Sequence, residues 1–190
     1  MYKFETHCHT TASDGRLSPA QVIEKLAEKG FDGVVITDHD TIKGLKEAKI
    51  TAKEYGLIFI PGIEITTPCC DILGIGIEKA IKGNAKEVIK AIHKLGGVAI
   101  LAHPCIDALS DIFRKRIGLI NEFDGIEVVN AHASLEANIQ ALKLAEEYKK
   151  VKTAGSDAHF EEDIGIVFTS SRYKDLVRAI KERKVGIGWV

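Results

Sequence analysis

Two short segments of this chain pair ligand-type side chains at a spacing of two residues. His7 and His9 form one pair, and Asp157 and His159 form another far along the sequence. In an extended chain, residues two apart point to the same side, so both members of a pair can reach one ion. Neutral imidazole and carboxylate groups are ligands of zinc, manganese and iron. Each pair therefore predicts half of a metal site.

The elements that must position these pairs are short buried strands alternating with amphipathic helices. β-branched runs predict strands at 34–37, 57–60, 98–101, 126–129 and 166–168, with further strands before His7 and near Val151. Helical patterns lie over 20–29, 42–55, 85–95, 135–149 and 173–184. This alternation predicts an α/β fold with parallel strands. Because an eightfold β/α barrel typically takes about 250 residues, the sheet would form a short or irregular barrel, or stay open.

Every one of the seven histidines except His93 falls on or just past the end of a predicted strand. In parallel α/β folds the carboxyl ends of the strands meet at one rim, where active sites are found. The candidate ligands at this rim are His7, His9, Asp14, His39, Glu64, His103, Asp157 and His159. At three or four protein ligands per ion, with one bridging carboxylate, they predict two or three divalent ions of zinc, manganese or iron.

Composition limits the classes of function. The chain has 190 residues, 45% of them hydrophobic and 28% charged, which is typical of a single globular domain over residues 1–190. Its 26 basic and 27 acidic side chains leave a net charge of −1, which argues against binding a long nucleic acid or a membrane through bulk charge.

With no bilayer-spanning apolar run and no signal-peptide layout, we expect a cytoplasmic protein. The four cysteines form no Cys-x-x-Cys pair and are expected to be reduced thiols.

Six motifs, in order along the chain, resemble those of the polymerase and histidinol phosphatase (PHP) superfamily. They are His7-x-His9-Thr10 with Ser13-Asp14-Gly15, Thr37-Asp38-His39-Asp40, Gly62-Ile63-Glu64, Ala102-His103-Pro104, Glu127-x-x-Asn130 and Gly155-Ser156-Asp157-Ala158-His159. Together they span about residues 3 to 170. The resemblance implies an irregular seven-stranded β/α barrel, a trinuclear metal site and phosphoesterase activity.

The resemblance also distributes the ligands among three metals. It implies that the first metal is held by His7, His9, Glu64 and Asp157, and the third by Asp14, His39 and His159. Glu64 would bridge the first metal to a second, which also takes His103. Members commonly place a further histidine ligand of the second metal where this sequence has Asp71. Asp71 is thus a candidate ligand for a second metal that is shifted, weaker or of another kind.

The predicted reaction is metal-dependent hydrolysis of phosphomonoesters or phosphodiesters, without a covalent intermediate. The net charge of −1 favours small phosphorylated substrates over long polynucleotides. The opening motifs most resemble the branch of the family that hydrolyses nucleoside phosphates and short oligonucleotides. His103, His132 and His159 are candidates for protonating the leaving oxygen, and the sequence does not choose among them. The arginines that could pair with phosphate are Arg16, Arg114, Arg116 and Arg172.

Two other classes of function fit the same ligand set. One is metal-dependent hydrolysis of C–N or ester bonds, which a panel of phosphates, amides and lactones would distinguish. The other is a non-catalytic metal-binding module, against which the complete row of ligands argues. The sequence predicts no particular oligomeric state.

Overall fold

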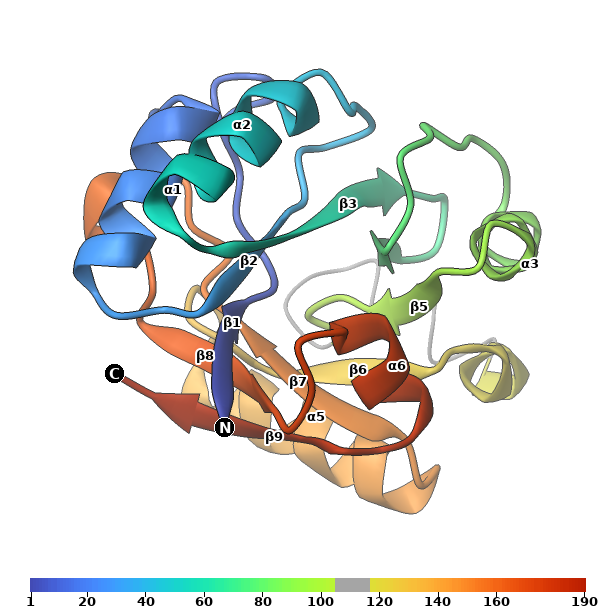
Figure 1. The fold of residues 1–190 in the computed structure, drawn as a ribbon. Coiled ribbons are helices and arrows are strands. Elements are labelled where there is room, and N and C mark those ends of the chain that lie inside the picture. The colour runs from blue at the N-terminus through green and yellow to red at the C-terminus, as the bar shows by residue number, and fades with distance from the viewer. Residues whose placement is uncertain (105–116) are drawn as a thin grey trace.

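A computed structural model describes residues 1–104 and 117–190 of the chain. Three residues considered from the sequence, Cys105, Arg114 and Arg116, lie outside the described residues. The described part forms one sheet of nine strands with helices packed against it (Figure 1). None of the described helices is long and apolar enough to cross a membrane.

The sheet has the strand order β7-β6-β5-β4-β3-β2-β1-β8-β9. Its strands are β1 (Tyr2–Glu5), β2 (Gly33–Ile36), β3 (Ile58–Thr66), β4 (Asp71–Ile75), β5 (Val98–Leu101), β6 (Gly125–Asn130), β7 (Val151–Gly155), β8 (Val167–Ser171) and β9 (Val185–Trp189). Parallel pairing joins β1, β2 and β3, and again β5, β6 and β7. β4 is antiparallel to both of its neighbours, and β8 is antiparallel to β1 and to β9.

The sheet curls until the chain beyond β1 meets the chain beyond β7. Cys8 and Ala158 form a parallel bridge at this point. The His9 N–H donates to the Ala158 carbonyl at 2.9 Å, and the Asp157 N–H donates to the His7 carbonyl at 2.8 Å. The sheet is therefore a nearly closed barrel at this end. The same bridge sets the two ligand-type pairs of the sequence side by side.

The expectation of a seven-stranded barrel is wrong, because the sheet has nine strands. The two strands that were not predicted are β4 and β9. β4 forms because the chain reverses sharply at Thr67, whose hydroxyl accepts the Cys70 N–H at 3.3 Å and whose own N–H donates to the Cys70 carbonyl at 3.1 Å. In β9 the alternating Gly186 and Gly188 weaken the sequence pattern of a strand. Both strands pair antiparallel, so the sheet is mixed rather than parallel.

Five α-helices are described, close to the predicted stretches. They are α1 (Pro19–Glu28), α2 (Leu45–Tyr55), α3 (Ala85–Lys94), α5 (Leu135–Glu147) and α6 (Leu176–Lys181), with 3-10 turns η1 (Ile117–Glu122) and η2 (Glu161–Asp163). Ser18 and Asn84 cap α1 and α3 in capping boxes, which explains why these two begin where the sequence indicates. α6 is shorter than expected, because Asp175 caps it and the chain then enters β9.

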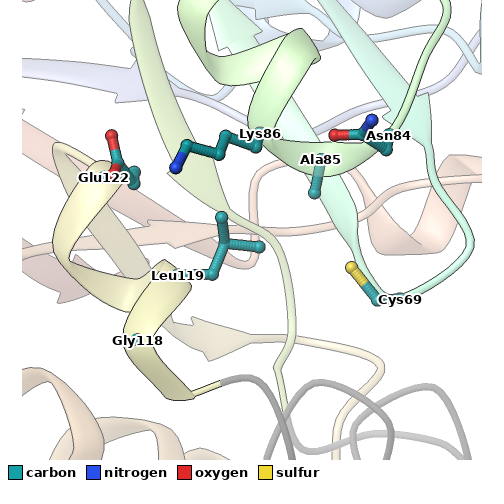
Figure 2. Close-up of a pocket in the computed structure, with 7 residues that line it drawn as sticks. All are labelled: Cys69, Asn84, Ala85, Lys86, Gly118, Leu119 and Glu122. Atoms are coloured by element: carbon teal, nitrogen blue, oxygen red, sulfur yellow. The ribbon is translucent and has the colours of Figure 1, made fainter.

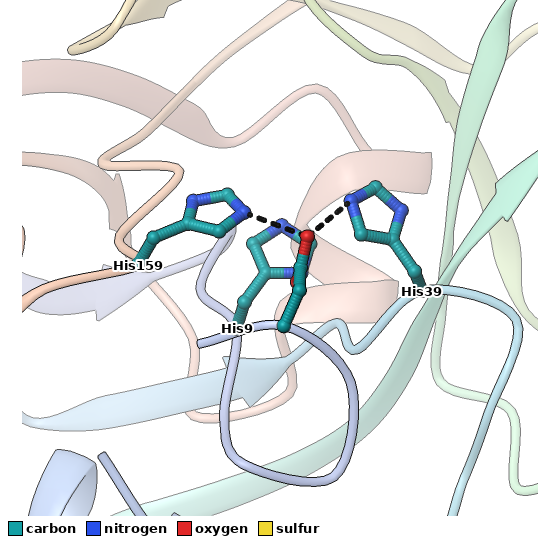
Figure 3. A group of neighbouring side chains, drawn as sticks. His9, His39 and His159 are labelled. Carbon is teal, nitrogen blue, oxygen red and sulfur yellow. Dashed lines mark ion pairs between the residues drawn. The ribbon is translucent and has the colours of Figure 1, made fainter. Parts of the chain in front are cut away.

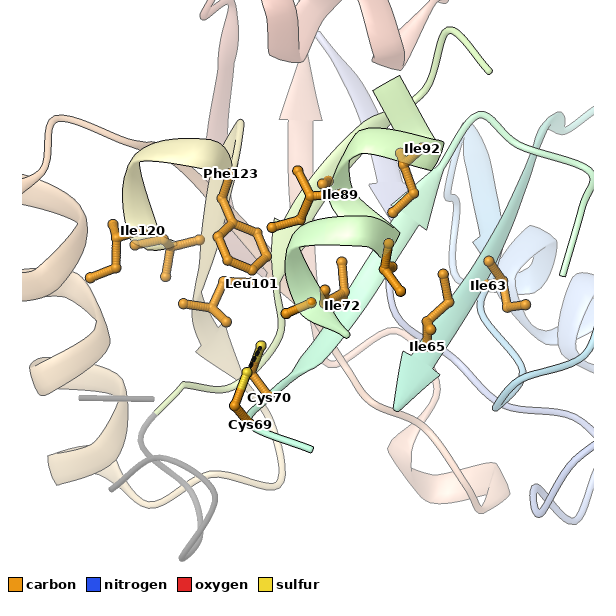
Figure 4. Packing of buried hydrophobic residues seen from close by; sticks show 14 of the residues in the cluster. Ile63, Ile65, Cys69, Cys70, Ile72, Ile89, Ile92, Leu101, Ile120 and Phe123 are labelled. Carbon is orange, nitrogen blue, oxygen red and sulfur yellow. Dashed lines mark hydrogen bonds between the residues drawn. The ribbon is translucent and has the colours of Figure 1, made fainter. Parts of the chain in front are cut away.

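Buried aliphatic side chains fill the space between the sheet and the helices. One cluster packs β3 and β4 against α3 and includes Ile63, Ile65, Ile72, Ile89 and Ile92 (Figure 4). Cys8 is fully buried in a second apolar cluster beneath α1, so it is a core residue, as its place between two ligands predicts. Burial of apolar surface stabilises the folded state by about 25 cal/mol per Å². This packing therefore fixes the positions of the strands and of the residues at their ends.

Candidate metal centre

Ligand-type side chains from most of the strands converge at the end of the barrel where β1 and β7 finish. They form three overlapping groups, and within each group the donor atoms all lie within 4.8 Å of one another. The groups are His7, His9, Glu64 and Asp157; Glu64, Asp71 and His103; and His9, Asp14, His39 and His159. We call these the first, second and third groups. All nine ligand candidates from the sequence are thus brought together.

The first group is buried at the centre. Its donors come from the chain beyond β1, from β3 and from the chain beyond β7. Glu64 Oε2 lies 3.0 Å from His7 Nε2 and 3.2 Å from His9 Nε2, and Asp157 Oδ1 lies 3.1 Å from His9 Nε2. The side chains of His7, His9 and Glu64 are fully inaccessible to solvent. Four converging donors in so small a space are typical of a metal site.

The third group lies on the solvent side of the first. Asp14 Oδ2 is 3.4 Å from His159 Nε2 and 3.7 Å from His39 Nε2, so one carboxylate faces two imidazoles. Figure 3 shows the rings of His9, His39 and His159 gathered at this point. The His9 ring stacks on His39 and on His159 with centroid distances of 4.4 and 4.3 Å. The Asp14 side chain is 54% exposed, which opens this end of the cluster to solvent.

The second group lies on the other side of Glu64. Glu64 Oε1 is 3.1 Å from His103 Nε2, while the other oxygen of Glu64 faces the first group. Asp71, the first residue of β4, completes the second group. Glu64 therefore offers one oxygen to each of two neighbouring groups, as a bridging carboxylate would.

The loop that carries Asp14 is held by a buried carboxylate. Asp38 Oδ1 accepts the Thr10 N–H at 2.7 Å and the Ser13 hydroxyl at 2.7 Å. Gly15 packs so closely that a Cβ there would lie 2.4 Å from the His9 carbonyl oxygen. These contacts explain the polar residues and the glycine of this motif, because they fold the loop back onto the segment beyond β1 that bears His9.

Two residues of the site hold a backbone conformation that L residues rarely adopt. The φ angles of His103 and Asp157 are 23° and 53°. Such positive φ values cost free energy and are retained where the surrounding structure requires them, often at functional sites. Here each one turns a ligand candidate inward at the end of its strand.

Glu127 and Asn130 orient the ligands, a role not assigned to them from the sequence. Glu127 Oε1 lies 2.9 Å from His7 Nδ1, and Glu127 Oε2 accepts a hydrogen bond from the backbone N–H of His103 at 3.0 Å. Asn130 Nδ2 donates to Asp157 Oδ2 at 3.0 Å and to Glu127 at 3.1 Å. A carboxylate behind a ligating histidine fixes the ring and strengthens it as a ligand. The signal in the sequence was a glutamate inside an otherwise apolar strand.

We expect Glu127→Gln to weaken metal binding about 10- to 100-fold, the usual effect of altering a partner behind a ligand. The amide keeps the volume of the carboxylate but binds His7 more weakly and can present an N–H to it. Calorimetric titration of metal into the metal-free protein measures the change. Glu136→Gln, at an exposed position in the first turn of α5, is the control and should leave the affinity unchanged. Equal affinities for Glu127→Gln and the unaltered protein would contradict the orienting role.

The carboxylates stabilise positive charge within the site. Burial opposes a charged imidazole, but hydrogen bonds to Asp157 and Glu64 raise the pKa of His9 to about 9. Burial likewise opposes the charged form of His103, yet its hydrogen bond to Glu64 raises the pKa of His103 to about 9. Burial favours a neutral Glu64, but the charge of His7 and hydrogen bonds from the surrounding histidines hold the pKa of Glu64 well below its usual range. The cluster thus has the electrostatic character of a cation site.

The residues present fit divalent metal ions. Among the described residues, three buried side-chain atoms have no hydrogen-bond partner, although buried polar atoms are normally paired: His9 Nδ1, Asp71 Oδ1 and Glu5 Oε2. Glu5 lies outside the ligand groups, whereas His9 and Asp71 belong to them, and there an ion would satisfy the unpaired atoms. The donors are imidazole nitrogens and carboxylate oxygens, the set used by zinc, manganese and iron.

His132 borders the third group without joining any of the three. Its Nε2 lies 3.2 Å from Asp163 Oδ2, and its ring meets that of His159 edge-on with centroids 5.9 Å apart. Asp163 Oδ2 also accepts a hydrogen bond from the backbone N–H of His159 at 3.1 Å. Of the histidines considered for proton transfer, His103 and His159 belong to ligand groups and His132 does not.

The two described arginines considered from the sequence lie in different places. Arg16 follows the loop of Asp14, and its guanidinium lies over the Phe160 ring, 6.0 Å from the centroid. Arg172 follows β8, whose last residue Ser171 pairs with Tyr2 at the start of β1. That is the end of the barrel opposite to the ligand groups, so the structure does not bring Arg172 to the site.

A separate pocket of about 390 Å³ lies between the start of α3 and η1 (Figure 2). It is lined by Cys69, Asn84, Ala85, Lys86, Gly118, Leu119 and Glu122. None of these described lining residues is a candidate metal ligand.

Sequence comparisons connect the chain to proteins of known and unknown activity. A family model described as PHP-associated matches residues 136–185. An uncharacterized protein of Methanocaldococcus jannaschii is 33% identical over 143 residues, which cover 68% of this chain and 82% of that protein. The 5'-3' exoribonuclease of Haemophilus influenzae is 48% identical over 65 residues, 34% of this chain and 24% of the exoribonuclease. The 3',5'-nucleoside bisphosphate phosphatase of Chromobacterium violaceum is 34% identical over 84 residues, 42% of this chain and 30% of the phosphatase.

A structural comparison extends the similarity over the whole chain. A two-domain protein of Bacteroides vulgatus, described as containing a predicted PHP-like metal-dependent phosphoesterase, superposes with a TM-score of 0.83 at 18% identity. The superposition covers 99% of this chain and 64% of that protein, and at this identity it shows the fold. The family model, the sequence relatives and the fold agree, and on these grounds the chain belongs to the PHP superfamily.

Proposed function

We propose that this protein hydrolyses small phosphate esters with the help of two or three divalent metal ions. The observation that carries the proposal is the row of three adjoining ligand groups, joined through the shared side chains of Glu64 and His9. Neighbouring ion sites that share a carboxylate are typical of phosphatases and nucleases that act on one phosphate with more than one metal.

The chain orients the donors and leaves one side open. Divalent ions in these groups would lower the pKa of an attacking water and place positive charge beside the phosphoryl oxygens. Glu127 and Asn130 hold His7 and Asp157 in place from behind. The exposed side chains of Asp14 and His39 mark the side from which a substrate would approach.

We assign protonation of the leaving oxygen to His132. His103 and His159 offer nitrogens to the ligand groups, so bound ions would engage them. Asp163 holds one ring nitrogen of His132 and leaves the other to exchange a proton with the substrate. An imidazole oriented by a carboxylate is a common general acid. His132 also borders the third group, where the site is open.

Small substrates are favoured by the charge of the chain. With a net charge of −1, a long polynucleotide would be attracted only by the metal ions and by nearby cations such as Arg16. A small phosphate ester would need only the metal centre itself. Two of the similar proteins are named as a nucleoside bisphosphate phosphatase and an exoribonuclease. These names support nucleoside phosphates and dinucleotides as the first substrates to test.

A substrate panel tests the proposal. The protein would be assayed with manganese, zinc and magnesium against nucleoside mono- and bisphosphates, dinucleotides, a chromogenic phosphate, long single-stranded and duplex nucleic acids, amides and lactones. We expect hydrolysis of the small phosphate esters, little action on long nucleic acid and none on amides. Efficient cleavage of long nucleic acid with small esters untouched would overturn the substrate class.

The same panel addresses the other classes of function. Hydrolysis of amides or lactones without hydrolysis of phosphates would establish a C–N or ester hydrolase instead. Metal binding with no hydrolysis of any substrate would establish a non-catalytic module. His132→Gln serves as an internal comparison, because it should slow the release of poor leaving groups more than that of nitrophenolate, which needs little protonation.

A further inference from the structure

The three ligand groups differ in the share of nitrogen among their donors. The third group has three imidazoles and one carboxylate, and the first group has two of each. The second group has a single imidazole, His103, and two carboxylates, Glu64 and Asp71. Oxygen donors therefore increase from the exposed side of the cluster to the side of Asp71.

Asp71 is held by the sheet, so its contribution to the second group is built in. It is the first residue of β4 and pairs with Thr66 of β3. Its carbonyl accepts the Ala102 N–H at 3.1 Å, and Ala102 directly precedes His103. Backbone pairing on both sides thus fixes the base of the Asp71 side chain beside His103, the one imidazole that the described residues bring to this group.

One oxygen of the Asp71 carboxylate is left without a hydrogen bond. This atom is the buried Oδ1, which has no hydrogen-bond partner among the described residues. Glu64 and Asp71 bring two carboxylates into this one group, whose donor atoms all lie within 4.8 Å of one another. A divalent cation between them would satisfy the unpaired oxygen and relieve the repulsion.

Resting on the proposed function, we propose that the second group is a manganese site, whereas the two histidine-rich groups hold zinc or iron, so that one protein carries two kinds of metal. Carboxylate oxygens suit manganese and magnesium, and imidazole nitrogens suit zinc and iron. An aspartate in place of an imidazole therefore lowers the preference of the second group for zinc over manganese. The residue that sets this preference is Asp71.

The test is a metal competition followed by spectroscopy. Metal-free protein would be equilibrated with limiting zinc and excess manganese, freed of loose ions, and analysed for metal per chain and for the electron paramagnetic resonance signal of bound manganese. We expect one bound manganese per chain, with zinc making up the remainder. Zinc alone on the washed protein would overturn the proposal.

Three variants locate the manganese. Asp71→His should raise the affinity for zinc relative to manganese at this group by at least about tenfold, since even partners behind a ligand have effects of that size. Its manganese signal should then disappear. Asp71→Asn should lose manganese without gaining zinc, because the amide keeps the shape but not the charge. Asp40→Asn is the matched control, since Asp40 lies nearby, accepts the Thr66 N–H at 3.3 Å and belongs to none of the groups.

The outcomes separate this proposal from the proposed function. The same ratio of manganese to zinc in Asp71→His and the unaltered protein would overturn the assignment of Asp71, whether or not phosphate esters are hydrolysed. A manganese signal that depends on Asp71, in a protein that hydrolyses no phosphate ester, would sustain the metal assignment and overturn the proposed function alone.

Discussion

Replacing Glu64 with glutamine should remove most of the bound metal and nearly all hydrolysis of phosphate esters, while the barrel remains folded. One oxygen of Glu64 lies 3.0 Å from His7 Nε2 and the other lies 3.1 Å from His103 Nε2, so a single side chain serves two ligand groups. A neutral amide is a poor bridge between two cations. Losing several kcal/mol of charge stabilisation corresponds to a fall in rate of about 10³-fold. The fold should persist, because the core beneath the site is apolar.

Metal per chain and kcat on a nucleoside phosphate are the measurements, with circular dichroism and the thermal midpoint as the test of folding. Glu161→Gln is the control, since the Glu161 side chain is 62% exposed and lies outside the three groups. It should match the unaltered protein in both metal content and turnover. Normal metal content and near-normal turnover in Glu64→Gln would rule out a bridging role for Glu64.

Gly155→Ala should damage the site through packing alone. Gly155 ends β7, and a Cβ there would lie 2.3 Å from His7 Cβ and 2.7 Å from Glu127 Oε1. Neither neighbour can move without displacing the contact between His7 and Glu127. Overpacking of this kind typically costs about 1–3 kcal/mol, which lowers the thermal midpoint of a chain of this size by roughly 5 °C. Metal affinity should fall about 10- to 100-fold, because the partner behind His7 is displaced.

The matched control is Gly118→Ala. A Cβ at Gly118 would meet no atom of the described residues within 4 Å, and Gly118 is exposed in η1. Thermal unfolding with and without added metal would measure both effects on the two variants. If Gly155→Ala bound metal as tightly as Gly118→Ala, the close packing of β7 against His7 would not be needed for the site.

The sequence was most informative where a polar residue interrupts or ends a buried strand. His7, His103 and Asp157 each follow a strand, and the rule that strand ends converge predicted that they would meet. The rule applies although the sheet is mixed, because the strands preceding these residues, β1, β5 and β7, keep the parallel arrangement with β2 and β6. Asp71 does not follow this rule, because it lies at the start of an antiparallel strand. Only the family resemblance indicated that it could be a ligand.

The features that sequence reasoning missed depend on contacts between distant residues. β4 follows a reversal made by the side chain of Thr67, and β9 depends on pairing with β8 rather than on its own glycine-rich pattern. Likewise, in the sequence Glu127 is only a polar residue within an apolar strand. Its role becomes visible in the structure, where Glu127 Oε1 lies 2.9 Å from His7 Nδ1. Local propensity carries little information about such pairings, because they are decided by tertiary packing.

The bridge that closes the barrel has a consequence for how the protein acquires its metal. His9 and Asp157 are in contact although they are 148 residues apart in the chain. An ion held by both would act as a crosslink around a loop that contains most of the molecule, and closing a loop of that length costs about 4 kcal/mol in chain entropy. In the unfolded chain His9 and Asp157 are far apart. Folding must therefore bring them together, at this cost in chain entropy, before an ion can bind to both. Metal affinity and the free energy of folding are therefore linked, and a mutation far from the ligands that loosens the barrel should also weaken the hold on the metal.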